Sequence, residues 1–229
     1  MAARPIFIVN PKGGQFVTVR DIQFEWFPGF AVVQKQKSIE SLHSNAVSSY
    51  GDMKILEISS KSKDELGIEL SAFNLMITTK KHQKTFSVES AFQGSKVFEN
   101  GGPFIDLLSK TSREAKKDPR LRSSGKLTKF SFYDTEWELE PKTLFYDWLY
   151  IKALLNKPEL INQILAFDAF TDIEFNPEKS INCQAYSAAL FVSLVKRNIL
   201  DEAFQSVEGY RNLIRPSNNS DNSQLSFAD

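Results

Sequence analysis

The sequence predicts a single α+β domain that is mainly helical and has short strands near its N-terminus. Short apolar or alternating runs, which are typical of strands, fill most of the first half of the chain. Longer stretches with apolar residues at helical spacing follow in the second half. Because strands and helices are segregated along the chain and do not alternate, an α+β domain is favoured over a doubly wound α/β domain.

The N-terminal half is expected to hold several strands and one helix. Lys37–Tyr50 is predicted to be a helix, because its apolar residues follow a helical spacing. Leu75–Thr79 and Lys84–Val88 flank the polar residues 80–83, a pattern that predicts a hairpin. The other predicted strands are Ile6–Val9, Phe16–Val19, Ile22–Phe27 and Lys54–Ile58.

The C-terminal half is expected to be helical apart from one short strand. Thr111 and Glu114 fit a capping box, in which two side chains satisfy free amides of the first turn. Pro141 is expected in the first turn of its helix, where proline is tolerated. The predicted helices are Glu89–Phe98, Pro141–Asn156, Pro158–Phe167, Ser180–Lys196 and Asp201–Leu213, and the strand is Phe170–Glu174.

No repeat or internal linker divides the chain, so residues 1–214 are interpreted as one domain. Residues 215–229 are rich in Ser, Asn and Asp, and we expect a disordered tail. The single cysteine, Cys183, excludes an internal disulfide and favours a reducing compartment. Because no apolar stretch is long enough to span a bilayer and no signal peptide is visible, we expect a cytoplasmic protein without a membrane partner.

Composition disfavours two classes of function. The chain has 28 Lys and Arg against 28 Asp and Glu, whereas a protein that coats a long nucleic acid needs an excess of positive charge. Recognition of a single nucleotide needs only a local cluster of charge, so it stays open. His43 and His82 have no His or Cys nearby in the sequence, so we expect no metal and no other cofactor.

Two local patterns carry charge in an arrangement that suits a ligand. Residues 113–129 hold seven Lys and Arg against two acidic residues, and they begin at a helix N-terminus that also favours anions. This run is interpreted either as a phosphate-binding patch or as a solvated face neutralised by the acidic run that follows. Glu89, Gln93 and Lys96 share one arc of a predicted helix, although the spacing alone favours a surface ion pair over a ligand site.

The order of these motifs resembles the NADAR family, which has a YbiA-like fold. Leu70–Asn74 and Val88–Glu89, with Gln93 and Lys96, resemble its two N-terminal motifs. The later matches are Ser112–Lys116, Glu136–Trp137, Pro141–Asn156 and Asp172–Glu174. Two further segments, 36–43 and 175–184, are similar to the NADAR proteins that are paired with DarT-type toxins, which extends the resemblance to about residues 4–208.

The resemblance implies an antitoxin that hydrolyses the bond between ADP-ribose and guanine bases of DNA, with RNA not distinguished. It implies that Glu89 is the acid/base residue and that Glu174 or Asp172 is a second carboxylate. Lys37, Lys96 and Lys116 compete for the roles of nucleophile, through a Schiff base, and phosphate contact, and Lys37 is assigned to catalysis. The remaining expected substrate contacts are Ser71, Phe73, Asn74, Gln93, Arg113 and Trp137.

Two alternatives to a glycohydrolase that acts on ADP-ribosylated DNA remain open. One is a non-catalytic module that binds ADP-ribose or the toxin, but the retained Glu89 and Glu174 favour catalysis. The other is an N-glycosidase for riboflavin-type metabolites. Ala72 and Ser90 replace the usual Asn and His of the family, and a Trp-Gly element is absent, so the base-side pocket is expected to differ from that of such enzymes.

Overall fold

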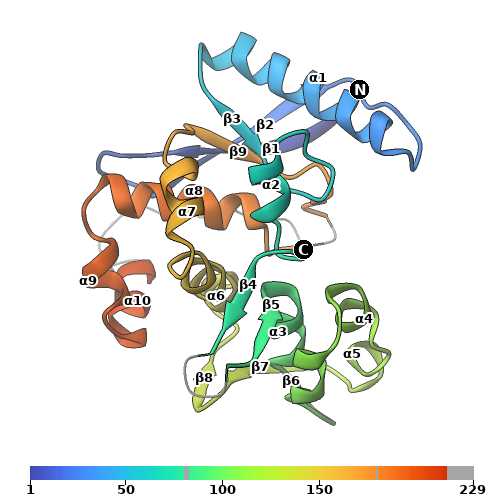
Figure 1. Cartoon of the computed structure of the whole chain (residues 1–229), viewed down its shortest axis with the longest axis vertical. Helices are drawn as coiled ribbons and strands as arrows, with labels where there is room; N and C mark the ends of the chain where they lie inside the picture. The colour runs from blue at the N-terminus through green and yellow to red at the C-terminus, as the bar shows by residue number, and fades with distance from the viewer. Residues whose placement is uncertain (80–82, 179, 216–229) are drawn as a thin grey trace.

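The computed structural model describes residues 1–79, 83–178 and 180–215. It has mixed α and β content, as predicted, in an upper layered part and a lower part joined by helices (Figure 1). The predicted tail lies outside the described residues except for Arg215, and so does most of the predicted hairpin loop at 80–83.

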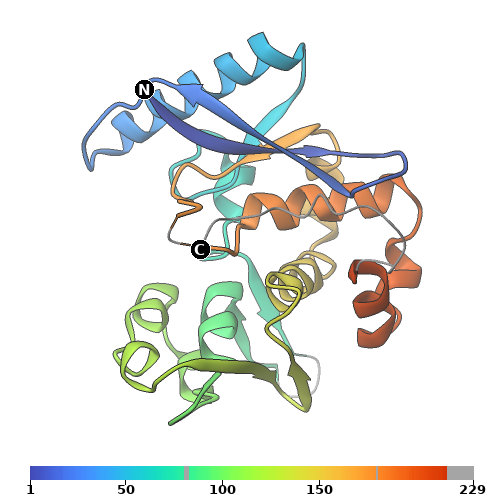
Figure 2. The same cartoon turned by 180° about the vertical axis from the view of Figure 1, so that it is seen from behind.

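The upper part is a four-stranded sheet between two helices. Its strand order is β2-β1-β9-β3, with β1 (Ala2–Val9), β2 (Val17–Phe24), β9 (Ala169–Thr171) and β3 (Ile55–Glu57). Figure 2 shows β1 and β2 between α1 (Val32–Tyr50) and α8 (Gln184–Lys196). Alternate residues of β1 face opposite layers: Ile6 packs in the cluster with residues of α1, and Phe7 in the larger core that includes α8.

Two details of the upper part correct the sequence analysis. The strands predicted at 16–19 and 22–27 are one strand, β2, because it pairs with β1 through Arg20 and Asp21 without a break. Such charged residues are tolerated because β2 is an edge strand. The strand predicted at 170–174 ends at Thr171, and it completes the N-terminal sheet, so strands and helices are less segregated than expected.

The lower part contains two small sheets and short helices. The predicted hairpin is confirmed as β4 (Met76–Thr78) paired with β5 (Thr85–Ser87). The second sheet has the order β6-β7-β8, formed by Lys96–Phe98, Leu127–Phe132 and Thr135–Trp137. The helices are α3 (Val88–Gly94), the 3₁₀ helix η1 (Ile105–Ser109), α4 (Ser112–Lys117) and α5 (Arg120–Ser123). The capping box of Thr111 and Glu114 at the start of α4 is confirmed.

The helix predicted to run to Phe98 is wrong in its second half. It ends at Gly94, and Lys96–Phe98 instead pairs with β7, so a ladder between distant segments overrides a helical spacing. β7 and β8 were not predicted, because the charged residues of these two strands were interpreted only as parts of a basic run and an acidic run. Phe130 of β7 and Trp137 of β8 lie directly opposite each other, and both are buried, so they anchor the β7–β8 pair to the core.

The two parts meet on α6 (Leu144–Leu154), which is buried on nearly all sides and packs against α8. The Glu140–Pro141 peptide is cis and α6 begins three residues later, so Pro141 is not in its first turn as predicted. The helix predicted at 201–213 is two helices, because the Ser206 side chain accepts the Gly209 amide and starts a new one. The remaining helices are α2 (Glu65–Glu69), α7 (Pro158–Ile164), α9 (Leu200–Phe204) and α10 (Val207–Ile214). Within the described ranges, no helix combines the length and the apolar character that crossing a membrane requires.

Candidate functional site

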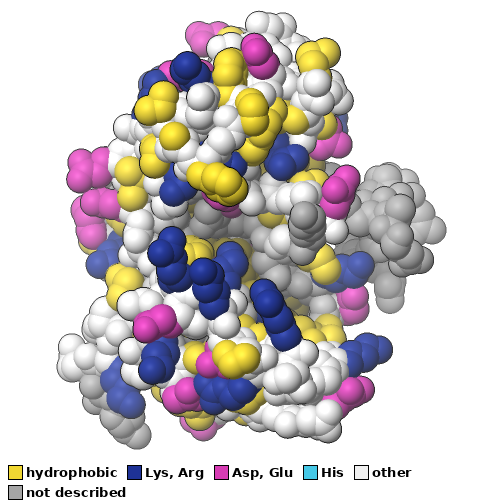
Figure 3. Space-filling view, turned by 90° about the vertical axis from the view of Figure 1, so that its right-hand side faces the viewer, with side chains coloured by type: hydrophobic (Ala, Val, Ile, Leu, Met, Phe, Trp, Pro, Cys, Tyr) yellow, Lys and Arg dark blue, Asp and Glu magenta, His cyan; other side chains and the backbone are white. Residues whose placement is uncertain are grey.

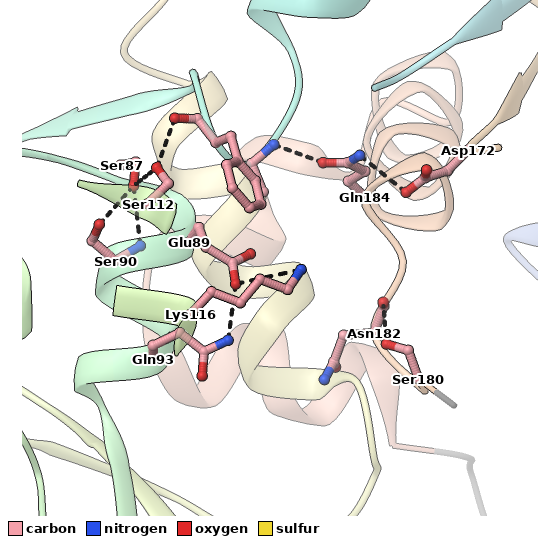
Figure 4. A network of polar contacts seen from close by, with 12 residues as sticks. Ser87, Glu89, Ser90, Gln93, Ser112, Lys116, Asp172, Ser180, Asn182 and Gln184 are labelled. Atoms are coloured by element: carbon pink, nitrogen blue, oxygen red, sulfur yellow. Dashed lines mark hydrogen bonds and ion pairs between the residues drawn. The ribbon is translucent and has the colours of Figure 1, made fainter. Parts of the chain in front are cut away.

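The candidate site lies where α3 and α4 of the lower part face the segment that precedes α8. Figure 3 shows this side of the molecule, where several Lys and Arg side chains surround a hollow between the upper and lower parts. In Figure 4 the side chains of Glu89 and Lys116 face Asn182 and Gln184 across this space. The residues that meet here come from segments up to about a hundred positions apart in the sequence.

Glu89 is a buried carboxylate at the start of α3. Ser87 caps this helix by accepting the Ser90 amide, and the Glu89 amide donates to the Ala72 carbonyl at 2.9 Å. Glu89 is only 5% exposed, and its Oε1 accepts a hydrogen bond of 2.9 Å from Gln93 Nε2. The predicted shared face of these two residues is therefore confirmed as a direct contact one helical turn apart.

Lys116 brings a positive charge to this carboxylate from α4. The Ser112 hydroxyl lies 2.8 Å from the Phe73 carbonyl oxygen and 2.7 Å from the Ser87 hydroxyl, which fixes α4 against α3. Lys116, one turn later, places Nζ 3.7 Å from Glu89 Oε1 and 5.1 Å from the ring centroid of Phe73. A carboxylate, an ammonium and a partly exposed aromatic ring thus adjoin one another.

Lys96 lies close to the same charges although it is not on the helix. It is the first residue of β6, and its Nζ lies 4.9 Å from the ring centroid of Phe92. Burial lowers the pKa of Lys96; the negative charge of Glu89 opposes this shift, and the positive charge of Lys116 adds to it. Lys96 therefore loses its proton at a lower pH than an ordinary lysine does.

Asp172 is the second carboxyl group at the site. Its Oδ1 accepts the Glu174 amide at 3.0 Å, and its Oδ2 accepts a hydrogen bond of 3.0 Å from Gln184 Nε2. Burial, with a contribution from the nearby Glu57, raises the pKa of Asp172 to about 8. Burial raises the pKa of Tyr146, and the negative charges of Glu89 and Asp172 add to this shift, so both carboxyl groups lie near this phenol.

A known protein family matches nearly the whole chain. The model of the DarT1-associated NADAR antitoxin family matches residues 2–224. The chain belongs to this family. No match was found among curated proteins. The name of the family associates this NADAR chain with a DarT1 toxin.

Several predicted site residues of the NADAR chain lie elsewhere or serve the local structure. Trp137 is 1% exposed and packs on Phe145 and Trp148, so it belongs to the core. Lys37 is exposed, with Nζ 5.9 Å from the ring centroid of Phe27. The side chains of Ser71 and Asn74 both donate a hydrogen bond to the Ile68 carbonyl oxygen.

The predicted basic run does not act as one patch. Arg120 donates to Asp106 and Asp118, and Lys129 pairs with Glu136 of the acidic run at 2.5 Å. Arg113 is exposed on the same helix as Lys116. Of the lysines and arginines predicted to bind substrate, Lys116 and Lys96 are the two that the structure brings to Glu89.

Sequence reasoning missed three residues that organise the site. Gln184 accepts the Ala72 amide at 2.6 Å and donates to Ile58 and Asp172, so one side chain joins three segments. Glu57 is buried and accepts hydrogen bonds from Thr171 Oγ1 and the Ile173 amide. A charged residue between Leu56 and Ile58 in a predicted strand was the available signal.

Lys35 is the third missed residue. Helix α1 begins at Val32, five residues before the predicted start, and Ala31 at its N-cap has no side chain that could mark it. Lys35 therefore lies in the first turn. Its Nζ is 3.4 Å from Glu174 Oε1 and 4.3 Å from the ring centroid of Trp26. Glu174 is thus an exposed ion-pair partner of α1, whereas Asp172 is buried.

The side chains gathered here suit acid–base chemistry on an anionic ligand. Glu89 and Asp172 are carboxyl groups in different environments, Lys116 supplies positive charge beside Glu89, and Lys96 supplies an amine whose pKa is lowered. Phe73 offers a ring that is 37% exposed for stacking. Among the described residues, no three or more His, Cys, Asp and Glu side chains form a group that could hold a metal ion.

Proposed function

We propose that this protein is an ADP-ribosyl glycohydrolase that removes ADP-ribose from guanine bases of DNA, and that it thereby counteracts a DarT-like toxin. The observation that carries the proposal is the buried carboxylate of Glu89, held between Gln93 and Lys116 and beside the exposed ring of Phe73. Membership of the antitoxin family supports the biological role. A pure binding module has no need of a second buried carboxyl group such as Asp172.

The proposed reaction breaks the bond between C1 of the distal ribose and the exocyclic nitrogen of guanine. Water supplies a hydroxyl group to C1 and a proton to the departing nitrogen, so the products are ADP-ribose and unmodified guanine. Glu89 transfers a proton between water and the leaving nitrogen as acid and base. Burial raises the pKa of Asp172, which favours its protonated form, and Asp172 is the proposed second proton donor.

Lysine residues contribute in two ways in this proposal. Lys116 and the exposed Arg113 on the same helix contact the pyrophosphate, because charge-assisted hydrogen bonds suit phosphate oxygens. Lys96 is the favoured nucleophile for a route through a Schiff base, in which its amine replaces guanine at C1 and water then releases ADP-ribose and the free amine, since burial lowers the pKa of Lys96. The structure offers less support for Lys37, whose exposed ammonium lies over Phe27.

The deciding experiment measures release of ADP-ribose from a DNA oligonucleotide that carries ADP-ribosylated guanine. We expect the purified protein to release ADP-ribose without added metal and to keep its rate in EDTA. Glu89→Gln keeps the size and the contact with Gln93 but removes the titrating group. Because general acid–base catalysis contributes about 10²–10⁴-fold, we expect its rate to fall at least about a hundredfold.

The control for this experiment is Glu69→Gln, which changes an exposed carboxylate on α2. We expect Glu69→Gln to keep the normal rate and Glu89→Gln to keep its affinity for ADP-ribose. A normal rate in Glu89→Gln would remove Glu89 from the mechanism. Binding of ADP-ribose without any release by the unaltered protein would favour a non-catalytic module.

A further inference from the structure

The loop between β2 and α1 presents apolar side chains to solvent. Phe30 is fully exposed, and Val32 and Val33, at the start of α1, are 45% and 59% exposed. An exposed phenylalanine beside two exposed valines is uncommon on a surface that binds nothing, because a contiguous apolar patch costs free energy in water. We refer to Trp26, Phe27, Phe30, Val32 and Val33 as the α1 platform.

Positive charge accompanies the α1 platform. Between Glu25 and Glu40 the sequence contains Lys35 and Lys37 but no acidic residue. Lys37 Nζ lies 5.9 Å from the ring centroid of Phe27, and Lys35 Nζ lies 4.3 Å from that of Trp26. Lys37 is exposed, whereas Lys35 is mostly buried and paired with Glu174, so Lys37 is the lysine of these two that can contact a phosphate beside the aromatic rings.

The α1 platform adjoins the candidate site through a chain of direct contacts. Lys35 pairs with Glu174 at 3.4 Å, and the Glu174 amide donates to Asp172. Asp172 accepts from Gln184, which also holds the segment of Ala72 next to the ring of Phe73. Figure 1 places the start of α1 above α4 on one side, and Figure 3 shows apolar and basic side chains around the hollow on that side.

We propose that the α1 platform binds the nucleotides that flank the modified guanine in a single DNA strand. An unpaired base stacks on Phe30, and Lys37 contacts the adjoining phosphate. This proposal rests on the proposed function and adds to it a surface for the neighbouring nucleotides, since an exposed ring can stack on an unpaired base.

The test compares two substrates that share the same scissile bond. One is a single-stranded oligonucleotide with a central ADP-ribosylated guanine, and the other is ADP-ribosylated guanosine monophosphate. For Phe30→Ala we expect the ratio of kcat/KM for the oligonucleotide to that for the mononucleotide to fall about tenfold, within the range of stacking on one base. Phe30→Trp should preserve the ratio, because tryptophan also stacks.

Tyr50→Ala is the matched control. Tyr50 is an exposed aromatic residue at the opposite end of α1, about 28 Å from the platform by the length of the helix. We expect Tyr50→Ala to leave the ratio unchanged. An unchanged ratio in Phe30→Ala, or an equal loss on both substrates, would overturn the assignment.

A second measurement keeps this proposal separate from the catalytic one. Fluorescence anisotropy with an unmodified, labelled single-stranded oligonucleotide reports binding without turnover. We expect weaker binding in Phe30→Ala than in the unaltered protein or in Tyr50→Ala, whether or not ADP-ribose is released. Unchanged oligonucleotide binding, together with lost binding of a DarT-type toxin, would assign the α1 platform to a protein partner and overturn the proposal.

Discussion

At the scale of single residues, Lys116 is placed for binding and contributes little to stability. Its side chain is 56% exposed, so its ion pair with Glu89 at 3.7 Å is largely screened by water. The same exposure leaves the ammonium available to a ligand, beside the ring of Phe73. An exposed cation next to a buried anion is an arrangement that an incoming phosphate can use.

Lys116→Ala is expected to weaken ADP-ribose binding without changing the melting temperature by more than a degree or two. Loss of one charge-assisted contact, worth about 1.5–3 kcal/mol, corresponds to about a 10- to 100-fold weaker affinity. Titration calorimetry measures the affinity, and Lys117→Ala is the control, since adjacent residues point to different sides of a helix. Unchanged affinity in both Lys116→Ala and Arg113→Ala would mean that the basic residues of 113–129 form a solvated face and do not bind the pyrophosphate.

At the scale of elements, Arg197 ties the end of α8 to the turn between β1 and β2. Its guanidinium donates to the carbonyls of residues 10 and 12–15, and it lies 4.5 Å from the ring centroid of Phe16. Gly13 and Gly14 in this turn have positive φ angles of 20° and 67°. The guanidinium therefore holds a turn whose carbonyls converge on one point, a geometry that a planar fork of donors can satisfy.

Arg197→Lys is expected to lower the free energy of unfolding by about 1–3 kcal/mol, because one ammonium cannot reach all the carbonyls that the planar guanidinium contacts. Chemical denaturation measures the change. Arg20→Lys is the control, since the exposed Arg20 donates, within the described part of the chain, to the adjacent Val19 carbonyl, and we expect a change within about 0.5 kcal/mol. Equal stability of the two variants would show that the turn holds its shape without Arg197.

The elements that could be predicted are those specified by neighbouring residues. The capping box at Thr111 and the hairpin of β4 and β5 depend on side chains a few positions apart, and both predictions are confirmed. β6 could not be predicted, because its strand conformation depends on pairing with β7, about thirty residues later. The start of α1 was missed because Ala31 offers no capping side chain.

The same distinction applies to the candidate site. Glu89 and Gln93 are four residues apart on one helix, so their contact follows from helical geometry. Gln184 meets Ala72 across 112 positions, and Thr171 meets Glu57 across 114. No local spacing encodes such contacts, so the sequence resemblance could place Asp172 in the site but not the residues that hold it.

At the scale of the whole molecule, buried titratable groups make stability depend on pH. Burial raises the pKa of Asp147 to about 7 and that of Asp172 to about 8. Burial also raises the pKa of Glu57, and it lowers the pKa of His43 to about 4. Asp147 receives a hydrogen bond of 2.6 Å from Ser187, but burial outweighs its hydrogen bonds, so its ionisation is poorly compensated.

The free energy of unfolding is expected to fall as the pH rises from 5 to 8. Between pH 3.8 and about 7, folded Asp147 binds a proton that the unfolded chain has lost, and the raised pKa values of Asp172 and Glu57 act in the same sense. Each such proton lowers stability by about 1.4 kcal/mol per pH unit as the pH rises. His43 acts in the opposite sense between about pH 4 and 6.5, so the fall is steepest just above pH 6.5.

Asp147→Asn isolates one of these groups, because it keeps the side-chain shape but cannot ionise. Between pH 5 and 7 the unaltered protein should lose about 2–3 kcal/mol more stability than Asp147→Asn, the effect of one proton over two pH units. Urea denaturation at several pH values measures this difference, and the exposed Asp52→Asn should follow the unaltered protein. Parallel pH profiles for the unaltered protein and Asp147→Asn would mean that Asp147 is already ionised at pH 5, and that the core near Ser187 compensates its charge.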